Sequence, residues 1–508
     1  MRKLFFSISL LASSMVMNVA AQEYVNPVIS GFNPDPSICR VGDDYYVVNS
    51  SFQYFPGVPI YHSKDLVNWE QIGNVLNRDS QLPLKGASSW LGIYAPTLRY
   101  NDGIYYMVTT NVGNGGNFFV TATRPEGPWS EPVWLEQQGI DPSLYFEDGK
   151  CYLVSNPDNN ITLCEIDAKT GKQLSESKSI WRGTGGRYPE GPHIYKKDGY
   201  YYLLISEGGT ELAHKLTIAR SRDIYGPYES NPANPIFTHC CMAAQGSVIQ
   251  GTGHGDFVQA ADGSWWMTFL AFRFYGGSYH HLGRETFLAP VEWKAGEWPV
   301  VNGNMPVDTL MRVATLPLSP VDRQLHRGRF PKTLGAEWVH IQNPVASNYR
   351  LHNGVLELKG AASLTLNDHP TFVGIRQTRP VMSVETLLDC SQMGNEGRAG
   401  ITVYQINDGH ADLFCEGGDA VLRCRIKSLD VELGRVKDVL HKGKCRLRME
   451  ADKDRYRFLC KKGDEWQEVG SLECSLLSTE VVGGFTGVVL GLYAEGDGVA
   501  RFQCFDEY

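Results

Sequence analysis

A short pattern recurs five times along the first part of this 508-residue chain: an aspartate at a turn, followed by aromatic and β-branched residues. Asp-Gly, present in four copies, is a strong hairpin signal because both residues tolerate the positive φ of a two-residue turn. The residues that follow have the composition of a β-strand, so the sequence predicts five similar hairpins. The copies are Asp43-Asp-Tyr-Tyr-Val-Val, Asp102-Gly-Ile-Tyr-Tyr-Met-Val, Asp148-Gly-Lys-Cys-Tyr-Leu-Val, Asp198-Gly-Tyr-Tyr-Tyr-Leu-Leu and Asp262-Gly-Ser-Trp-Trp-Met-Thr.

The hairpins follow one another at roughly 45 to 65 residues, a spacing that suits four-stranded blades of a β-propeller. A β-sandwich gives no reason for a fivefold repeat, and the repeat of a β-helix is much shorter. Helix signals are scarce between the hairpins. We therefore predict an all-β chain whose first domain, residues 22–320, is a five-bladed β-propeller.

The repeat stops after Pro317-Leu-Ser-Pro-Val321, and short strand-like segments follow. Their period-two alternation indicates an antiparallel sandwich. The clearest alternation places three apolar side chains on one face: Cys445, Leu447 and Met449. We predict that residues 321–508 form a lectin-like, concanavalin-like β-sandwich. Glycan binding by this accessory domain is left open. The preferred role is to buttress the propeller, with a loop that reaches the rim of its pocket.

The N-terminus has the features of a secretory signal peptide over residues 1–21. Arg2 and Lys3 precede an apolar segment, and Ala20-Ala21 offers a small-residue cleavage site. The apolar segment is short for a membrane-spanning helix, and no stop-transfer pattern follows it. The mature chain is therefore predicted to be secreted or periplasmic, with no membrane span after signal cleavage.

The net charge limits the kinds of partner that the chain can bind, and the cysteine positions limit its disulfides. The formal net charge of −9 argues against nucleic acid or an anionic membrane, and it is compatible with a neutral substrate. Five of the 12 cysteines precede residue 320 and seven follow it, without the CxxC spacing of many metal sites. Export permits disulfides, but both counts are odd, so either a bridge crosses the domains or some thiols stay free.

A second regularity lies seven or eight residues before each hairpin aspartate. In a propeller the first strand of each blade lines the central axis, so equivalent residues on these strands point toward one pocket. We predict that Asp35, Asp141, Glu190 and His254 meet there, with Ala95 in the second blade. The segments are Asn33-Pro-Asp35-Pro-Ser, Tyr94-Ala-Pro-Thr97, Ile140-Asp141-Pro-Ser, Pro189-Glu190-Gly-Pro-His and Thr252-Gly-His254-Gly-Asp256.

Three carboxylates at matched positions indicate function, although any one aspartate beside proline is a common turn residue. Converging acids repel one another unless something compensates them. Hydrolysis of a glycosidic bond uses such a set: a carboxylic acid protonates the leaving oxygen and a carboxylate activates water. A third charge can keep the acid protonated at working pH. The pattern identifies Asp35, Asp141 and Glu190 without assigning their roles.

Further segments occur in a recognisable order from residue 24 to about 300. They are Asn26-Pro-Val-Ile-Ser-Gly-Phe-Asn-Pro-Asp35-Pro-Ser-Ile-Cys-Arg40, Phe55-Pro-Gly-Val, His62-Ser-Lys-Asp-Leu-Val-Asn-Trp69, Gly139-Ile-Asp141-Pro-Ser-Leu, Glu190-Gly-Pro-His, Ser206-Glu-Gly-Gly-Thr and Leu282-Gly-Arg-Glu-Thr286. Together they resemble glycoside hydrolase family 43, and Gly397-Arg-Ala-Gly-Ile-Thr-Val-Tyr404 resembles the sandwich appended to many relatives. The resemblance implies inverting exo-hydrolysis. It makes Asp35 the general base, Glu190 the general acid, and Asp141 the residue that orients the acid and raises its pKa.

The same resemblance implies an aromatic sugar pocket. Phe52 and Tyr94 match its walls. The family often has Trp where Tyr94 stands and Asp where Thr97 stands, so the shape of the pocket is expected to differ here.

Two more residues match positions that have known roles in the family. Arg284 matches an arginine that binds sugar hydroxyls, and its alternative interpretation is a surface ion pair with Glu285. His254 matches an axial histidine near a bound calcium or water, and its preferred interpretation is a satisfied core histidine. No cofactor is expected to be required, and His254 is the one candidate metal ligand. Any calcium would be structural, because the chain has no EF-hand loop.

The preferred function is release of non-reducing terminal α-L-arabinofuranosyl residues from plant hemicellulose such as xyloglucan or arabinoxylan. Similarity in Gly185-Gly-Arg-Tyr-Pro-Glu190 and in Tyr94-Ala-Pro-Thr97 favours it over a β-D-xylosidase acting on xylo-oligosaccharides. A non-catalytic glycan-binding propeller is a further alternative, which loss of any of the three acids would support. The last is a retaining hydrolase, whose two carboxylates lie ~5 Å apart rather than ~6.5–9.5 Å.

Overall fold

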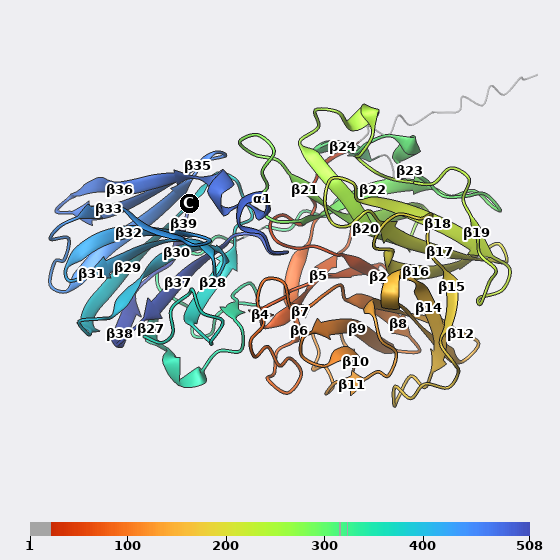
Figure 1. Ribbon diagram of the computed structural model, residues 1–508, viewed down its shortest axis with the longest axis horizontal. Coiled ribbons are helices and arrows are strands. Elements are labelled where there is room, and N and C mark those ends of the chain that lie inside the picture. The colour runs from red at the N-terminus through yellow and green to blue at the C-terminus, as the bar shows by residue number, and fades with distance from the viewer. Residues whose placement is uncertain (1–21, 314–315, 323) are drawn as a thin grey trace, which may run out of the picture.

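The computed structural model describes residues 22–508 except 314–315 and 323, and it is almost entirely β-structure in two parts (Figure 1). The predicted signal peptide, residues 1–21, lies outside the described residues. The one α-helix among the described residues is α1 (Thr479–Val482). Short 3-10 turns occupy Pro157–Asn159, Met242–Ala244, Asn302–Asn304, Ala346–Asn348 and Cys474–Leu477. None of the helices in the described ranges is long and apolar enough to span a bilayer.

The first part consists of five consecutive antiparallel sheets, which confirms the predicted five-bladed propeller. Each blade has four strands in chain order, and the second gains the short strand β7 (Gly92–Ile93). The blades are β2 (Ser37–Val41), β3 (Asp44–Val48), β5 (Gly57–Ser63) and β6 (Glu70–Leu76); β8 (Thr97–Asn101), β9 (Ile104–Val112), β10 (Gly116–Ala122) and β11 (Val133–Trp134); β12 (Ile140–Glu147), β13 (Lys150–Asn156), β14 (Ile161–Ile166) and β15 (Lys178–Trp181); β16 (Glu190–Lys197), β17 (Tyr200–Glu207), β18 (Lys215–Ser221) and β19 (Glu229–Ser230); β20 (Ile249–Gln259), β21 (Trp265–Arg273), β22 (Glu285–Glu292) and β23 (Val300–Val301).

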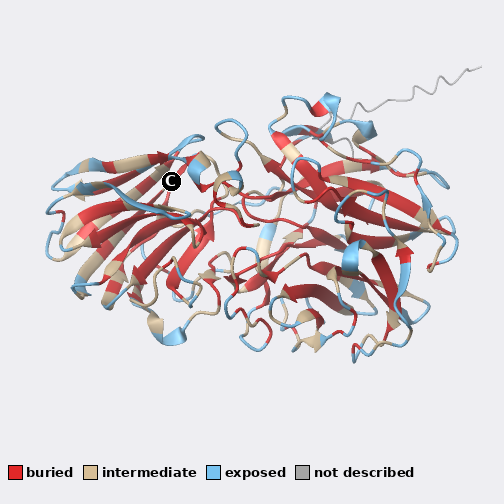
Figure 2. Ribbon diagram, in the orientation of Figure 1, coloured by how far each residue is buried: buried red, intermediate tan, exposed pale blue. Residues whose placement is uncertain are grey.

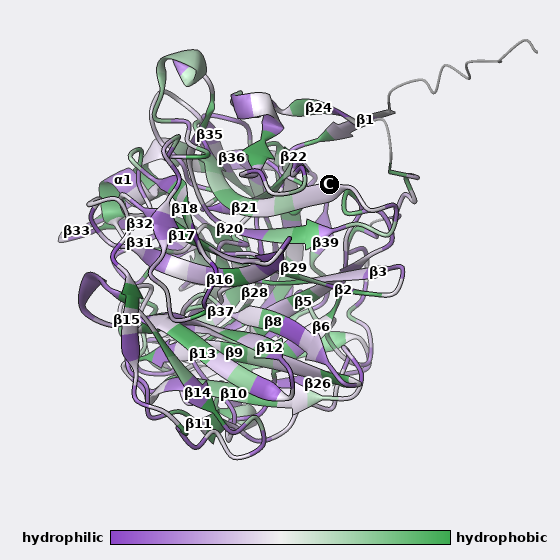
Figure 3. Ribbon diagram, turned by 90° about the vertical axis from the view of Figure 1, so that its right-hand side faces the viewer, coloured by the Kyte–Doolittle hydropathy of each residue, from purple (hydrophilic) through white to green (hydrophobic). Residues whose placement is uncertain are grey.

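The predicted hairpins join the first two strands of each blade. In the second, third and fourth blades the Asp-Gly pair forms a two-residue turn, and Asp102, Asp148 and Asp198 have φ of 49°, 50° and 50°. The glycine that follows each aspartate also has positive φ, as a type I′ turn requires. In Figure 3 hydrophobic residues lie along strands such as β9 and β13, and the surrounding loops are mostly hydrophilic. Local turn chemistry therefore sets the register of the inner strands.

The ring closes where the two ends of the propeller pair. Strand β1 (Gln22–Val25) pairs antiparallel with β24 (Leu310–Val313), beyond the fifth blade. On the axis, Ser37 of β2 donates a hydrogen bond to Asp256 of β20 at 2.8 Å. The first and fifth blades are therefore neighbours.

The second part is a sandwich of two antiparallel sheets, as predicted. In β34 the inward residues Cys445, Leu447 and Met449 are buried in its core. The larger sheet contains β26 (Tyr349–His352), β27 (Val355–Lys359), β38 (Gly498–Phe502), β29 (Met382–Met393), β34 (Lys444–Ala451), β35 (Arg455–Lys462) and β36 (Glu465–Glu473), with β39 (Asp506–Glu507) beside β29. The smaller contains β28 (Thr371–Arg376), β37 (Val489–Glu495), β30 (Arg398–Ile406), β31 (Gly409–Glu416), β32 (Asp419–Ile426) and β33 (Leu429–Val436).

Extensive contacts join the sandwich to the propeller, and buried segments meet where the two parts touch (Figure 2). Strand β4 (Tyr54–Phe55) of the propeller pairs with β25 (His340–Ile341). At Gly487 the two backbones are so close that a Cβ would lie 2.2 Å from the carbonyl oxygen of Leu282. The sandwich therefore has a fixed position beside the mouth of the propeller. The division after residue 320 stays a prediction.

Candidate active site

On the inner strand of each blade, one residue occupies an equivalent position relative to the pairing with the second strand. Asp35, Asp141 and His254 all have a left-handed backbone, with φ of 53°, 52° and 44°. Each lies two residues before the residue that restores regular pairing with the second strand, and β12 and β20 show a register shift there. Such irregularities turn side chains away from the regular alternation of a strand. In these blades they direct the side chains toward the axis.

The predicted equivalence is off by one residue in the fourth blade. There the left-handed residue is Gly191, with φ of 58°, and Glu190 precedes it. A Cβ at Gly191 would lie 2.9 Å from Cε1 of His254, so only glycine leaves room for that imidazole ring. The longer Glu190 side chain compensates for the displaced position, because its charge still interacts with those of Asp35 and Asp141.

Short contacts between side chains bring the predicted residues into one cluster. Nη1 of Arg284 lies 3.2 Å from Oδ1 of Asp35, and Nδ1 of His254 lies 3.8 Å from the same oxygen. The backbone N–H of Gly191 donates to Oδ2 of Asp141 at 3.2 Å, which links the third and fourth blades. The three carboxyls therefore share one largely buried site, with Asp35 and Asp141 only 5% and 6% exposed.

Asp35 is held in its ionised form. Burial raises the pKa of this carboxyl, but Arg284, His254 and the Ser50 hydroxyl together lower it below its usual value. Ser50 Oγ donates to Oδ2 of Asp35 at 2.6 Å, and a donor to a carboxylate stabilises the charged form. Asp35 is thus able to accept a proton at neutral pH.

The pKa of Glu190 is shifted in the opposite direction to that of Asp35. Burial, followed by the negative charge of Asp35, raises the pKa of Glu190 to about 8. Burial and the charges of Glu190 and Asp35 also raise the pKa of Asp141 well above its usual value. Two neighbouring carboxyls of this kind titrate as a pair that retains one proton near neutral pH. The hydrogen bond from Gly191 N–H stabilises the ionised form of Asp141, whereas the Glu190 carboxyl accepts no hydrogen bond among the described residues. These contacts favour the shared proton on Glu190.

His214, which the sequence analysis missed, supports the same distribution. It is fully buried, and burial lowers its pKa to about 3, so the ring is neutral. Its Nδ1 lies 3.3 Å from the carbonyl oxygen of Gly251, which can only accept, so Nδ1 carries the hydrogen. The unprotonated Nε2 therefore faces Oε1 of Glu190 at 3.7 Å, and a lone pair there disfavours a carboxylate. One isolated histidine gives no sequence signal for this role.

Arg284 joins the two domains at the site. The alternative of a surface ion pair with Glu285 is wrong, because Arg284 is 5% exposed and the Glu285 carboxylate pairs with Arg273 at 2.7 Å. Arg284 Nη1 also donates to Thr210 Oγ1 at 2.9 Å, and Nη2 donates to the backbone oxygen of Phe485 at 3.2 Å. A loop of the sandwich therefore reaches the carboxyl site, as predicted.

Aromatic rings line one side of the site. Phe52 and Tyr94 have ring centroids 5.2 Å apart, and Phe485 lies 5.7 Å from Phe52. Trp90 packs edge-on against Phe485 at 4.8 Å and is 47% exposed. The hydroxyl of Tyr94 donates to the backbone oxygen of Trp90 at 2.6 Å. The predicted pair of walls is thus extended by two rings that the sequence analysis did not identify.

Below the carboxyls a buried polar network occupies the axis. Asp256 accepts hydrogen bonds from Ser37 at 2.8 Å, Tyr195 at 2.6 Å and Arg99 at 2.9 Å. Nη2 of Arg99 also contacts Nδ1 of His193 at 2.9 Å. Calcium takes six to eight oxygen ligands, whereas this acid is already neutralised by a guanidinium. Asp256 is therefore not a free ligand for the structural calcium that the resemblance suggests, and that calcium stays a prediction.

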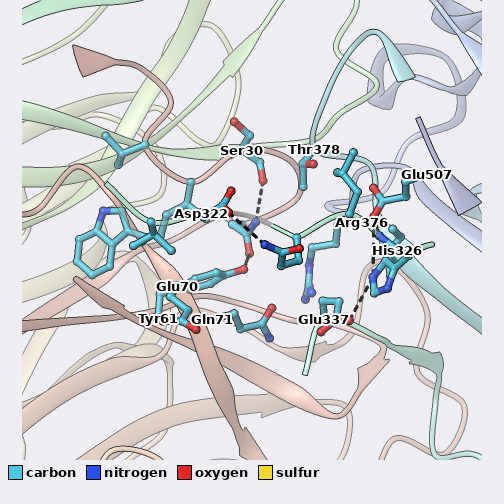
Figure 4. Close-up of a pocket in the computed structure, with 18 residues that line it drawn as sticks. Ser30, Tyr61, Glu70, Gln71, Asp322, His326, Glu337, Arg376, Thr378 and Glu507 are labelled. Atoms are coloured by element: carbon cyan, nitrogen blue, oxygen red, sulfur yellow. Dashed lines mark hydrogen bonds and ion pairs between the residues drawn. The ribbon is translucent and has the colours of Figure 1, made fainter. Parts of the chain in front are cut away.

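A separate cavity of about 560 Å³ lies between the propeller and the sandwich (Figure 4). Tyr61 donates to Oδ1 of Asn33 at 2.8 Å within it, and Nε2 of His326 lies 3.2 Å from Oε1 of Glu337. None of the three catalytic candidates lines this cavity. We assign it to the domain interface and not to the carboxyl site.

The fold and the carboxyl site together define a glycoside hydrolase. The chain belongs to glycoside hydrolase family 43: the model of Glycosyl hydrolases family 43 matches residues 24–299. The model of the beta xylosidase C-terminal concanavalin A-like domain matches residues 329–507. The resemblance inferred from the sequence is thereby confirmed, as is the expected fold.

Similar proteins span nearly the whole chain. A non-reducing end α-L-arabinofuranosidase of Bacteroides ovatus is 41% identical over 96% of both chains. A xylosidase/arabinosidase of Butyrivibrio fibrisolvens is 41% identical over 93% of this chain and 96% of its own. A solved Bacteroides ovatus structure, described as xyloglucan PUL GH43B, has a TM-score of 0.92 and 40% identity. It covers 96% of this chain and 100% of that chain.

Proposed function

We propose that this enzyme is an inverting exo-α-L-arabinofuranosidase that releases non-reducing terminal residues from plant hemicellulose. The observation that carries the mechanism is the opposite protonation of two acids in one pocket. The pKa of Asp35 is lowered, whereas that of Glu190 is raised to about 8. Glycoside hydrolysis requires one carboxylate and one carboxylic acid at neutral pH, and the choice of a single displacement rests on the resemblance to glycoside hydrolase family 43.

In this mechanism Asp35 removes a proton from water as the water attacks the anomeric carbon. Glu190 donates its proton to the glycosidic oxygen as the bond breaks, so no free alkoxide leaves. Burial and the charge of Asp35 raise the pKa of Glu190, and in this mechanism the ionised carboxylate of Asp141 raises it further. The hydrogen bond from Gly191 N–H to Asp141 fixes the backbone next to the acid. Phe52, Tyr94, Arg284 and His254 would bind the terminal sugar.

Exo action is supported by the loop that carries Phe485. Its carbonyl accepts from Arg284, and its amide donates to the backbone oxygen of Ser89 at 3.1 Å. The ring of Phe485 is thereby held against Phe52 and Trp90 on one side of the pocket. A site covered in this way accepts a chain end more readily than the middle of a polymer.

The choice of arabinofuranoside is supported by the similarity to the Bacteroides ovatus arabinofuranosidase, and the xyloglucan description of the similar structure suggests that polymer as a source. A β-D-xylosidase is the second candidate, favoured by the xylosidase/arabinosidase relative and by the family of the sandwich domain. Hydrolysis of the 4-nitrophenyl α-L-arabinofuranoside and β-D-xylopyranoside by one preparation separates the two. We expect a higher kcat/KM on the arabinofuranoside, and a preference for the xyloside would overturn the assignment.

Replacing Asp141 by asparagine should shift the alkaline limb of the pH–rate profile. Activity requires protonated Glu190 and is lost as pH rises through the pKa of Glu190, about 8. Loss of a neighbouring negative charge lowers the pKa of this acid, so the limb should move to lower pH. A profile of kcat against pH measures it. If Asp141 instead carried the shared proton, the limb would stay where it is.

Replacing Phe485 by alanine should lower kcat/KM by ~10–100-fold, the equivalent of the ~1.5–3 kcal/mol that burial of such a ring contributes. The backbone contacts to Arg284 and Ser89 do not depend on the side chain, so the loop keeps its anchor. Steady-state kinetics on the arabinofuranoside check this result. Trp134→Ala, which removes a 41% exposed ring on an outer strand, serves as the aromatic control. Equal kinetics for the two variants would refute a role for Phe485 in binding.

We also propose export to the periplasm or the medium, on the basis of the signal-like residues 1–21. Mass spectrometry of the protein from a native periplasmic fraction should give a mature N-terminus at Gln22. An intact Met1 would contradict this proposal.

A further inference from the structure

Three cysteines from distant parts of the chain converge inside the sandwich. The Sγ atoms of Cys390, Cys415 and Cys445 all lie within 4.8 Å of one another. No other group of three His, Cys, Asp or Glu side chains in the described ranges converges closely enough to hold a metal ion. The spacing in the sequence does not indicate this group, because its three cysteines lie on separate strands that meet only in the folded chain.

The strands explain the convergence. Cys390 on β29 and Cys445 on β34 belong to neighbouring strands of the larger sheet, where Leu388 pairs with Cys445 and the amide of Cys390 donates to the oxygen of Gly443 at 2.9 Å. This register directs both cysteines to the inner face. Cys415 lies on β31 of the opposite sheet (Figure 1). The three sulfurs therefore bridge the two layers of the sandwich.

The backbone neighbours of the cluster are small residues. In the smaller sheet Cys415 pairs with Ala399 on one side and Ala420 on the other. Gly443, opposite Cys390, adds no side chain. Cys415 and Cys445 are 5% and 3% exposed, whereas Cys390 is half-buried. The cluster is therefore shielded by small residues and accessible from one direction, through Cys390.

Buried cysteines usually act as small hydrophobic residues, and Cys424 and Cys460 in the same core have that character. The cluster differs in that Sγ of Cys415 and Sγ of Cys445 are only 2.8 Å apart, with a third sulfur beside them. Thiolates are the preferred ligands of Zn²⁺ and Cu⁺. A Zn–S bond of ~2.3 Å places two tetrahedral sulfurs roughly 3.8 Å apart, within reach after a small movement.

We propose that Cys390, Cys415 and Cys445 bind one thiophilic metal ion, for which Zn²⁺ is the first candidate. The bound ion would crosslink the two sheets of the sandwich. The three thiols release their protons to solvent as the metal–sulfur bonds form. A water molecule entering past Cys390 takes the fourth position of a tetrahedral ion. The ion has a structural role, because none of the three cysteines contacts the carboxyl site.

The test uses the full-length enzyme, reduced with a phosphine, loaded with Zn²⁺ and freed of excess metal by gel filtration. We expect one zinc per chain by elemental mass spectrometry, and protection of the three thiols from alkylation until a chelator is added. Cys390→Ser, Cys415→Ser and Cys445→Ser should each lose the retained zinc. Cys424→Ser, a similarly buried cysteine of the smaller sheet, should retain it.

Zinc-free wild-type enzyme after loading would overturn the proposal, as would equal zinc content in all four variants. So would a peptide map showing that a Cys415–Cys445 disulfide is the stable form and that the reduced protein still binds no metal. Should a variant fail to fold, the zinc content and thiol protection of the wild type decide the question. Turnover of the nitrophenyl arabinofuranoside by Cys390→Ser should stay within about twofold of wild type, because distant sites act independently.

Discussion

Glu190→Ala should lower kcat on an arabinofuranosyl oligosaccharide by about 10³-fold, within the ~10²–10⁴-fold that general acid catalysis contributes. The leaving sugar hydroxyl is a strong base and needs a proton as the glycosidic bond breaks. A dinitrophenyl arabinofuranoside has a leaving group that departs without protonation, so its kcat should fall far less. Comparison of the two substrates measures the role of Glu190 as an acid, independently of its effect on binding.

The control for this variant is Glu211→Ala. Glu211 pairs with Arg187 at 2.6 Å, and its side chain is 70% exposed. It should leave both activities near wild type, and both variants should keep the unfolding temperature of the parent. Equal losses on the two substrates for Glu190→Ala would show that Glu190 does not protonate the leaving group.

Asp35→Ala should lower kcat to near zero on the oligosaccharide and on the dinitrophenyl glycoside alike. Water must be deprotonated whichever group leaves, so a better leaving group cannot compensate for a missing base. Steady-state rates on the oligosaccharide and the dinitrophenyl glycoside check this equality. Asp35→Asn, which keeps the size of the side chain beside Arg284 and Ser50, separates loss of the base from a rearranged pocket.

The surface variant Asp43→Ala at the first hairpin is a suitable control for Asp35, because it changes an exposed aspartate of the same blade. Near-normal turnover by Asp35→Asn would exclude Asp35 as the base. A loss confined to the oligosaccharide would instead assign the acid role to Asp35 and reverse the proposed mechanism.

Much of the propeller could be predicted because each hairpin is determined by residues that are adjacent in the sequence. An Asp-Gly turn with both residues at positive φ determines its own hairpin, and three such turns, at Asp102, Asp148 and Asp198, mark the second, third and fourth blades. The spacing from hairpin to axis then located Asp35, Asp141 and His254. It misplaced Glu190 by one residue, because spacing does not reveal that the His254 ring requires glycine at the equivalent point.

Residues that act through contacts between distant segments escaped the sequence analysis. Phe485 lies in a glycine-rich loop of the sandwich, and nothing local indicates that it reaches Arg284 in the propeller. His214 and Ser50 carry no motif, and their effect on the carboxyls depends on burial and orientation. The cysteine cluster was missed for the same reason: strand pairing, and not sequence spacing, brings its three sulfurs together.

In the proposed mechanism ionised Asp35 acts as the base on water and protonated Glu190 as the acid, so the anomeric carbon undergoes a single displacement. The most direct test is proton NMR of the hydrolysis of an α-L-arabinofuranoside, recorded before the released sugar equilibrates in water. We expect β-L-arabinofuranose, the inverted anomer, to form first and the α anomer to appear later. Initial release of the α anomer would show retention and contradict the assignment of Asp35 as the base.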